Sequence, residues 1–130
     1  MVSVQAQIGL DHYQTVLTNG RQHRAMADEP ADVGGTDTAF APDEWLAGAL
    51  ASCAIITMRM YADRKQWPVE RIELTVSLER TPEGITRFQK QVHFTGNISE
   101  EQVQRLLAIG DKCPVHKTLS NPIEILSVIV

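Results

Sequence analysis

The chain has 130 residues, of which 43% are hydrophobic and 22% are charged, and its formal net charge is -4. This length and composition suit one globular domain over residues 1–130, with little room for a second core. The 12 basic residues are scattered, whereas a nucleic-acid surface requires clustered Lys and Arg. We therefore expect a single domain without a nucleic-acid partner.

The N-terminus and the apolar segments predict where the protein resides. No basic segment followed by an apolar run opens the chain, so no signal peptide is expected. The longest uncharged stretch, Trp45 to Met58, is shorter than the roughly 20 residues of a membrane span. We expect a cytoplasmic protein with no membrane partner. In that compartment, a cysteine pair that oxidises is more often catalytic or redox-sensing than structural.

The N-terminal third predicts a small antiparallel meander. Apolar and polar residues alternate over residues 2–8 and again over 13–17, which is typical of strands. Asn19-Gly20 is a strong hairpin signal, and Arg21 to Asp28 is the expected third strand. Residues 27–42 are rich in Gly, Pro and Asp and predict a long loop, which in a small domain is often functional.

A long helix is predicted over about residues 43–65. Pro42 suits the first helical position, and the acidic residues Asp43 and Glu44 suit the positive end of the helix dipole. Apolar residues at three- and four-residue spacing form one face: Leu46, Ala49, Leu50, Cys53, Ile56 and Met60. Because Ile55 and Met58 are apolar on other faces, we expect burial nearly all round. A subunit interface is the expected cover, and central packing against the sheet of a single chain is the alternative.

The C-terminal half predicts a hairpin followed by two helices. Alternation over residues 72–78, a turn over 81–84 and apolar residues between 88 and 94 indicate paired strands. Ser99 and Gln102 have the spacing of a capping box at the start of the next helix. Pro114 would be the first residue of a further helix, with Cys113 at its N-cap.

The tail from Ile123 to Val130 is predicted to be a closing strand. The resulting element order, with strands joined as hairpins and helices segregated from them, predicts an α+β fold with antiparallel sheets.

The two cysteines are the strongest functional signal. Cys53 lies in an apolar helical segment and Cys113 opens the motif CPVHKTL, an arrangement suited to forming and breaking a disulfide. At a helix start beside Lys112 and Lys117, the pKa of Cys113 is expected to be lowered, and His116 could add to this effect. The alternative is that both cysteines are small buried hydrophobic residues.

A thiol at Cys53 needs a nearby cation, since apolar enclosure alone disfavours the thiolate. Arg21, Arg24 and Arg59 are the candidates, and Asp43 could orient such an Arg through a bidentate pair. Asp43 precedes Cys53 by about 15 Å of helix, so the pair would require a bridging Arg or a partner subunit. The alternatives are a helix-terminal charge for Asp43 and a solvated strand residue for Arg24.

Metal and organic cofactors are not expected. Cys113 and His116 have the spacing of half a zinc site, but a structural zinc site needs four ligands and the chain has no second such pair.

The segment ADEPADVGGTDTAFAPDEWLAGALASCAIITMRMYADRKQWP, with CPVHKTL further along, resembles the OsmC/Ohr family of thiol-dependent peroxidases, on the OsmC-like branch. The resemblance implies an intertwined homodimer with active sites at the interface. It implies reduction of organic hydroperoxides, with Cys53 as the peroxidatic thiol and Cys113 as the resolving thiol. It also implies catalytic roles for Asp43, where the family usually has Glu, and for an Arg of the N-terminal strands, which we place at Arg24 in preference to Arg21.

The mechanism implied by this resemblance is oxidation of Cys53 to a sulfenic acid and its condensation with Cys113 to a disulfide. A dithiol reductant, for which the family suggests dihydrolipoamide, would then restore the thiols. Two other classes stay open. One is a thiol-disulfide exchange or sulfur-handling redox protein, and the other is a non-catalytic module that binds a small apolar ligand.

Overall fold

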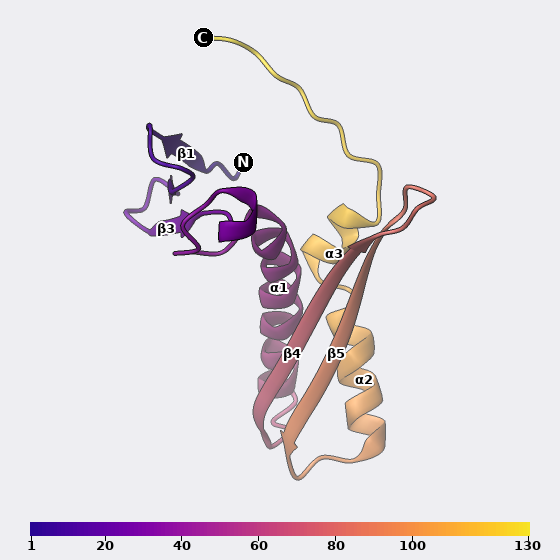
Figure 1. Cartoon of the computed structure of the whole chain (residues 1–130). Helices are drawn as coiled ribbons and strands as arrows, with labels where there is room; N and C mark the ends of the chain where they lie inside the picture. Colours follow the sequence, from indigo (N-terminus) through magenta and orange to yellow (C-terminus); the bar gives the residue numbers. More distant parts are fainter. The chain divides into compact units, whose positions relative to one another are not determined.

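The computed structural model describes all 130 residues, which form two compact units, Met1–Leu46 and Ala47–Val130. Figure 1 shows the elements of each unit. Three short strands make the first unit: β1 (Gln5–Ile8), β2 (Thr15–Thr18) and β3 (Arg24–Ala27). They pair antiparallel in the order β1-β2-β3, which confirms the predicted meander.

The third strand begins later than the sequence predicts. The Asn19 side chain accepts a hydrogen bond from the backbone N–H of Arg21 at 3.0 Å, and Gln22 has a positive φ of 72°. Such a backbone cannot continue a strand, because a non-glycine residue at positive φ leaves the β region. Arg21 therefore lies in the turn, and β3 starts at Arg24.

A long loop follows β3 and leads into helix α1 (Pro42–Arg64), whose bounds agree with the predicted helix. The loop contains one short 3-10 helix, η1 (Ala31–Val33). By length and composition α1 could cross a membrane, a test that core helices of soluble proteins also pass. A membrane span in α1 would have to include the charged Arg59, because the uncharged stretch Trp45 to Met58 is too short to span a membrane by itself.

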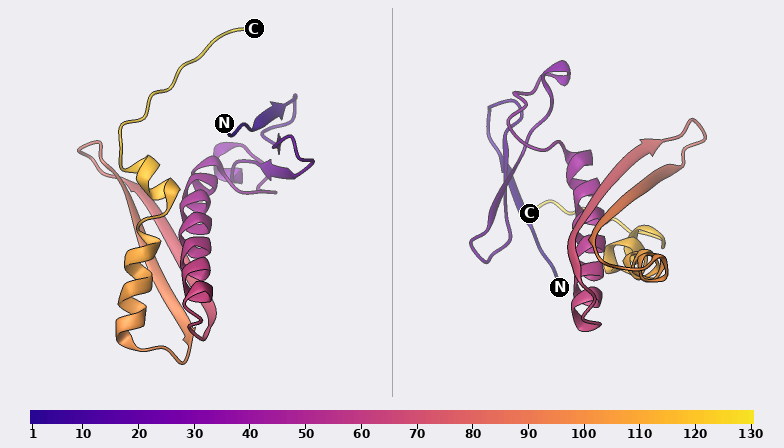
Figure 2. Two further views of the ribbon diagram at one scale, coloured as in Figure 1. Left: turned by 180° about the vertical axis from the view of Figure 1, so that it is seen from behind. Right: turned by 90° about the horizontal axis from the view of Figure 1, so that it is seen from below.

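The second unit packs a hairpin on two helices. Strands β4 (Val69–Arg80) and β5 (Thr86–Gly96) pair antiparallel, and α2 (Glu100–Gly110) and α3 (Pro114–Leu119) follow. The views in Figure 2 show α1 and α2 side by side along this hairpin. The alternating half-buried residues of the hairpin pack against the core, as predicted: Ile72, Leu74, Val76, Phe88, Val92 and Phe94.

The buried face of α1 differs from the predicted one. Leu50, Ala54, Met58 and Ala62 are buried at four-residue spacing, while Ile56 and Met60 are 51% and 64% exposed. Burial nearly all round is therefore wrong for the single chain. The hairpin and α2 cover one side of the helix, and a unit of this size supplies no second layer for the other.

The predicted caps of α2 and α3 are confirmed. Ser99 and Gln102 exchange both hydrogen bonds of a capping box at 2.8 and 3.1 Å. Cys113 is the N-cap of α3 and Pro114 is its first residue. The α+β class is confirmed with these elements.

The predicted closing strand is wrong. Residues 123–130 have no secondary structure, and the apolar side chains of this tail are exposed. Alternating apolar residues are not sufficient for a strand, because its N–H and C=O groups need a neighbouring strand. The chain offers the tail no such partner.

Candidate active site

Cys53 lies near the middle of α1, beside the buried stripe of that helix. Its side chain is half-buried and packs against the core cluster that contains Leu50, Ala54 and Cys113. The backbone carbonyl of Cys53 accepts a hydrogen bond from the Thr57 hydroxyl at 2.7 Å. The helix therefore holds the thiol at the boundary between the core and the open face of α1.

Cys113 is held by the start of α3. Its backbone is extended (φ -65°, ψ 149°), and its sulfur accepts a hydrogen bond from the backbone N–H of His116 at 3.4 Å. Pro114 fixes the first helical φ and has no N–H of its own to satisfy. The thiol thus takes the place of the Ser or Asp oxygen that usually caps a helix. The Cys113 side chain is fully buried.

The two thiols, 60 residues apart in the sequence, meet in the core of the second unit. Both are free thiols, Cys53 packs against the core cluster to which Cys113 belongs, and Cys53 is close enough to Cys113 to raise the pKa of its thiol. The helix-centre thiol and the helix-start thiol are therefore close enough to interact directly. This is the arrangement that disulfide formation during a reaction cycle requires.

Burial raises the pKa of the Cys113 thiol, and the neighbouring Cys53 raises it further. The His116 N–H and the positive charge of Lys90 act in the opposite direction but do not offset burial. The expectation of a lowered pKa is therefore wrong. The helix start does stabilise the thiolate, but desolvation of a fully buried group outweighs it. Lys112 and Lys117, which the sequence favoured as activating cations, are exposed.

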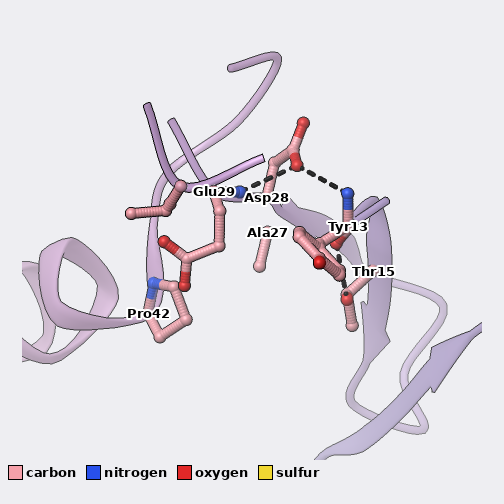
Figure 3. Close-up of a pocket in the computed structure, with 7 residues that line it drawn as sticks. Tyr13, Thr15, Ala27, Asp28, Glu29 and Pro42 are labelled. Carbon is pink, nitrogen blue, oxygen red and sulfur yellow. Dashed lines mark hydrogen bonds between the residues drawn. The ribbon is translucent and has the colours of Figure 1, made fainter. Parts of the chain in front are cut away.

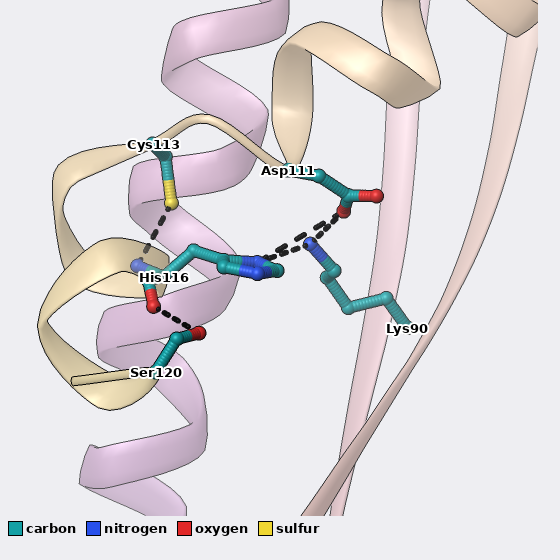
Figure 4. A network of polar contacts seen from close by, with 5 residues as sticks. All are labelled: Lys90, Asp111, Cys113, His116 and Ser120. Carbon is teal, nitrogen blue, oxygen red and sulfur yellow. Dashed lines mark hydrogen bonds and ion pairs between the residues drawn. The ribbon is translucent and has the colours of Figure 1, made fainter.

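A polar cluster adjoins Cys113 (Figure 4). Lys90, from β5, forms an ion pair with Asp111, which follows α2, and its Nζ lies 3.3 Å from Nδ1 of His116. The Lys90 side chain is only 17% exposed. Sequence reasoning missed Lys90, because 23 residues separate it from Cys113, and it missed Asp111 because that carboxylate joins the cluster through its ion pair with Lys90. The alternating pattern of β5, which sets the face on which Lys90 lies, was the only available signal.

Arg24 and Asp43 both belong to the first unit, so their assigned roles stay predictions. Arg24 is the first residue of β3, opposite Thr18, and is exposed. It lines an apolar pocket of about 230 Å³ together with Leu17, His23 and other residues of that unit. Asp43 is exposed in the first turn of α1, where its charge suits the helix dipole.

Arg59, the third candidate cation, is engaged elsewhere. Its Nε and Nη2 donate to Oδ1 of Asp63 at 2.9 and 2.6 Å, and its Nη1 donates to the Val69 carbonyl at 2.7 Å. These bonds tie the end of α1 to the start of β4. The guanidinium of Arg59 therefore has a structural role within the second unit.

Asp28 is a buried carboxylate that sequence reasoning missed. It is 2% exposed and accepts hydrogen bonds from the backbone N–H groups of Tyr13 and Glu29, at 3.0 and 2.7 Å, and from Thr36 and Thr38. The Thr36 hydroxyl, with these other donors, holds the pKa of Asp28 far below its ordinary value despite burial. An Asp followed by Thr-x-Thr across a Gly-Gly pair was the available signal.

These hydrogen bonds of Asp28 hold the long loop. Asp28 lines a pocket of about 510 Å³ with Tyr13, Glu29, Pro42 and three other residues of the first unit (Figure 3). No group of three or more His, Cys, Asp or Glu side chains is arranged to hold a metal ion. The proximity of Cys53 and Cys113 makes these two thiols the candidate reactive groups.

A family model described as OsmC-like protein matches residues 35–127, which include both thiols. The chain belongs to the OsmC-like family. No curated protein matches it. Among solved structures, an OsmC-like protein from Mycoplasma pneumoniae is 19% identical with a TM-score of 0.76, and the match covers 92% of this chain and 87% of that one.

Two further solved structures share this fold. An organic hydroperoxide resistance protein OsmC from Legionella pneumophila is 22% identical with a TM-score of 0.66, covering 92% of this chain and 88% of that one. An OsmC-like protein of unknown function from Vibrio cholerae is 15% identical with a TM-score of 0.70, covering 91% and 92%. At these identities the likeness establishes the fold alone.

Proposed function

We propose that this OsmC-like protein is a cysteine-based peroxidase that reduces organic hydroperoxides. The observation that carries the proposal is the contact between Cys53 and Cys113. Family membership and the hydroperoxide-resistance proteins among its structural neighbours support it. The protein would act in the cytoplasm in defence against oxidative stress.

The two thiols have different environments, and these suit different roles. Cys53 is half-buried on an open helix and is the thiol that a substrate can reach, whereas Cys113 is fully buried. In the proposed cycle the Cys53 thiolate attacks the distal peroxide oxygen, the O–O bond breaks, and an alcohol leaves. Cys113 then attacks the resulting sulfenic acid, forming a disulfide and releasing water.

The cycle closes when a dithiol reductant exchanges with the disulfide and is itself oxidised. We further propose that Arg24 supplies the cation for Cys53 and that Asp43 orients it. The working form would be a homodimer, because α1 exposes Trp45, Leu46, Ile56 and Met60 in the single chain. Large exposed apolar side chains grouped on one helix are typical of a protein interface.

The decisive experiment is a thiol titration before and after one equivalent of cumene hydroperoxide, with intact mass to locate the oxidation. The proposal expects loss of both thiols, no added oxygen, and a mass consistent with one Cys53–Cys113 disulfide. Unchanged thiols would contradict it. A disulfide that forms with a small disulfide reagent but not with hydroperoxide would favour the thiol-disulfide exchange alternative.

A further inference from the structure

Cys113 presents a physical problem for the proposed reaction. A buried thiol with a raised pKa holds its proton at neutral pH, yet only the thiolate attacks efficiently. A group that stabilises the developing negative charge on Cys113 would therefore accelerate disulfide formation. The cluster of Lys90, Asp111 and His116 lies in the position for this task.

We propose that Lys90, held by Asp111, is a positioning residue that stabilises the thiolate of Cys113 while the disulfide forms. The inference rests on the proposed function and deepens it. Three elements converge here: β5 supplies Lys90, the turn after α2 supplies Asp111, and the first turn of α3 supplies His116.

The contacts connect this cluster to the thiol in two ways. First, His116 connects Cys113 to Lys90. Its backbone N–H donates to the Cys113 sulfur, and Nδ1 of its ring lies 3.3 Å from Nζ of Lys90. The positive charge of Lys90 also acts on the Cys113 thiol directly, lowering its pKa. The charged or titratable groups of this cluster are Lys90, Cys53, the His116 ring and Asp111, which is the counter-ion of Lys90 and lies 4.0 Å from Nδ1 of His116.

The surroundings of Lys90 strengthen its field. Its side chain lines a pocket of about 260 Å³ whose other walls include Met58, Leu74, Val92 and Leu107. Water screens a charge less beside such apolar walls than on an open surface. The negative charge of Asp111 offsets part of the positive charge of Lys90. The effect on the Cys113 thiolate is therefore the difference between the two charges.

The chemistry of the assisted step balances without another reactant. The Cys113 S–H bond breaks, its sulfur forms a bond to the Cys53 sulfur, and the S–O bond of the sulfenic acid breaks. The departing hydroxide takes up the proton and leaves as water. Lys90 exchanges no electrons and keeps its proton, because its part is to stabilise negative charge on Cys113.

The test uses the full chain in a Cys53→Ser background, where the ultraviolet absorbance of the thiolate reports Cys113 alone. Lys90→Met should raise the titration midpoint by about one pH unit, a shift typical of losing one nearby opposite charge. Asp111→Asn should lower the midpoint, because it removes a negative charge and keeps an oxygen that can accept from Lys90. Lys90→Arg keeps the positive charge, so its titration midpoint should stay near that of the parent protein.

Arg87→Met is the matched control, since Arg87 is an exposed cation of the same strand, paired with Glu79. It should leave the midpoint unchanged. A merely structural role for Lys90 and Asp111 would move both variants in the same direction, and that result, or unmoved midpoints, would overturn the inference. Should Lys90→Met not fold, Asp111→Asn still decides: a lowered midpoint, with that of Lys90→Arg unchanged, supports the inference, and an unchanged or raised midpoint overturns it.

With both cysteines present, Lys90→Met should leave the first, hydroperoxide-dependent phase unchanged and slow disulfide formation about tenfold at neutral pH. Equal slowing of both phases would contradict the inference. Absence of sulfenic acid in the parent protein, with the titration midpoints shifted as expected, would instead overturn the peroxidase proposal and leave the role of Lys90 intact.

Discussion

The thiol of Cys113 meets the thiol of Cys53 where the start of α3 lies against the middle of α1. This contact joins a fully buried sulfur to a half-buried one. Once oxidised, an exposed pair would exchange its disulfide with any small thiol, and two inaccessible thiols would meet no substrate. This difference in burial suits a pair in which the half-buried Cys53 reacts with the substrate and the buried Cys113 reacts only with Cys53.

Substitution of each thiol separates their roles. Cys113→Ser should consume one equivalent of organic hydroperoxide and stop at a sulfenic acid, because the thiol that condenses with it is absent. Cys53→Ser should consume none. Dimedone trapping with intact mass measures both. Equal single-turnover rates for the parent protein and Cys53→Ser would remove the assignment of Cys53 as nucleophile.

Arg24→Ala should slow alkylation of Cys53 at neutral pH about tenfold, measured in a Cys113→Ser background, because the thiolate loses its cation. Arg21→Ala is the matched comparison, since Arg21 lies in the turn before β3. If Arg21→Ala slows the alkylation of Cys53 and Arg24→Ala does not, Arg21 is the residue that supplies the cation. Normal rates for both would remove the electrostatic support for a peroxidatic Cys53.

Asp28→Asn should destabilise the protein in a pH-dependent way. Hydrogen bonds lower the pKa of Asp28 in the folded state, so its stabilising effect is present above an unfolded pKa of about 3.9 and fades as the pH falls below that value. The difference in unfolding free energy between variant and parent should be largest near neutral pH and shrink below about pH 4. Urea titrations across this range measure it.

Asp32→Asn serves as the control for Asp28, because Asp32 is an exposed carboxylate of the same loop. Its unfolding free energy should follow that of the parent at every pH. An Asp28→Asn deficit that persists unchanged in acid would show that the side-chain shape, and not the charge, holds the loop.

Met58→Ala should reduce the free energy of unfolding by about 2–5 kcal/mol, because Met58 is a large, fully buried side chain of the core. The Met58 Sδ would lie 3.1 Å from a Cβ placed on Gly110, so α1 and α2 are tightly packed at this contact. We therefore expect the cavity left by the substitution to stay unfilled. Met58→Leu, which conserves volume, should cost less than about 1.5 kcal/mol. Similar losses for both would argue against tight packing at this contact.

Light scattering at micromolar concentration should give about twice the mass of one chain. The exposed apolar side chains of α1 and of the tail over residues 123–130 are the physical reason, since water contact with so much apolar surface is unfavourable. Met60→Glu should shift the protein towards monomer. A monomeric parent protein would remove the interface from the proposed active site.

The sequence predicted the elements whose signals are local. Ser99 and Gln102 identify a helix start because a capping box spans only one turn, and Cys113-Pro114 does so for the same reason. The alternation in β4 and β5 predicted their inward faces, since side chains alternate across any strand. The start of β3 did not follow from the alternation, because the Asn19 side chain and the positive φ of Gln22 decide where the strand begins.

Family membership and the choice of Cys53 and Cys113 also followed from the sequence by itself, because their motifs are short and specific. Only the tertiary structure decided that the two thiols touch, that the pKa of Cys113 is raised, and that Lys90 and Asp111 lie beside it. The same holds for the burial of Asp28 and for the unpaired tail. The reason is physical: desolvation, charge pairing and strand pairing depend on residues that are distant in the chain, and no local pattern encodes their approach.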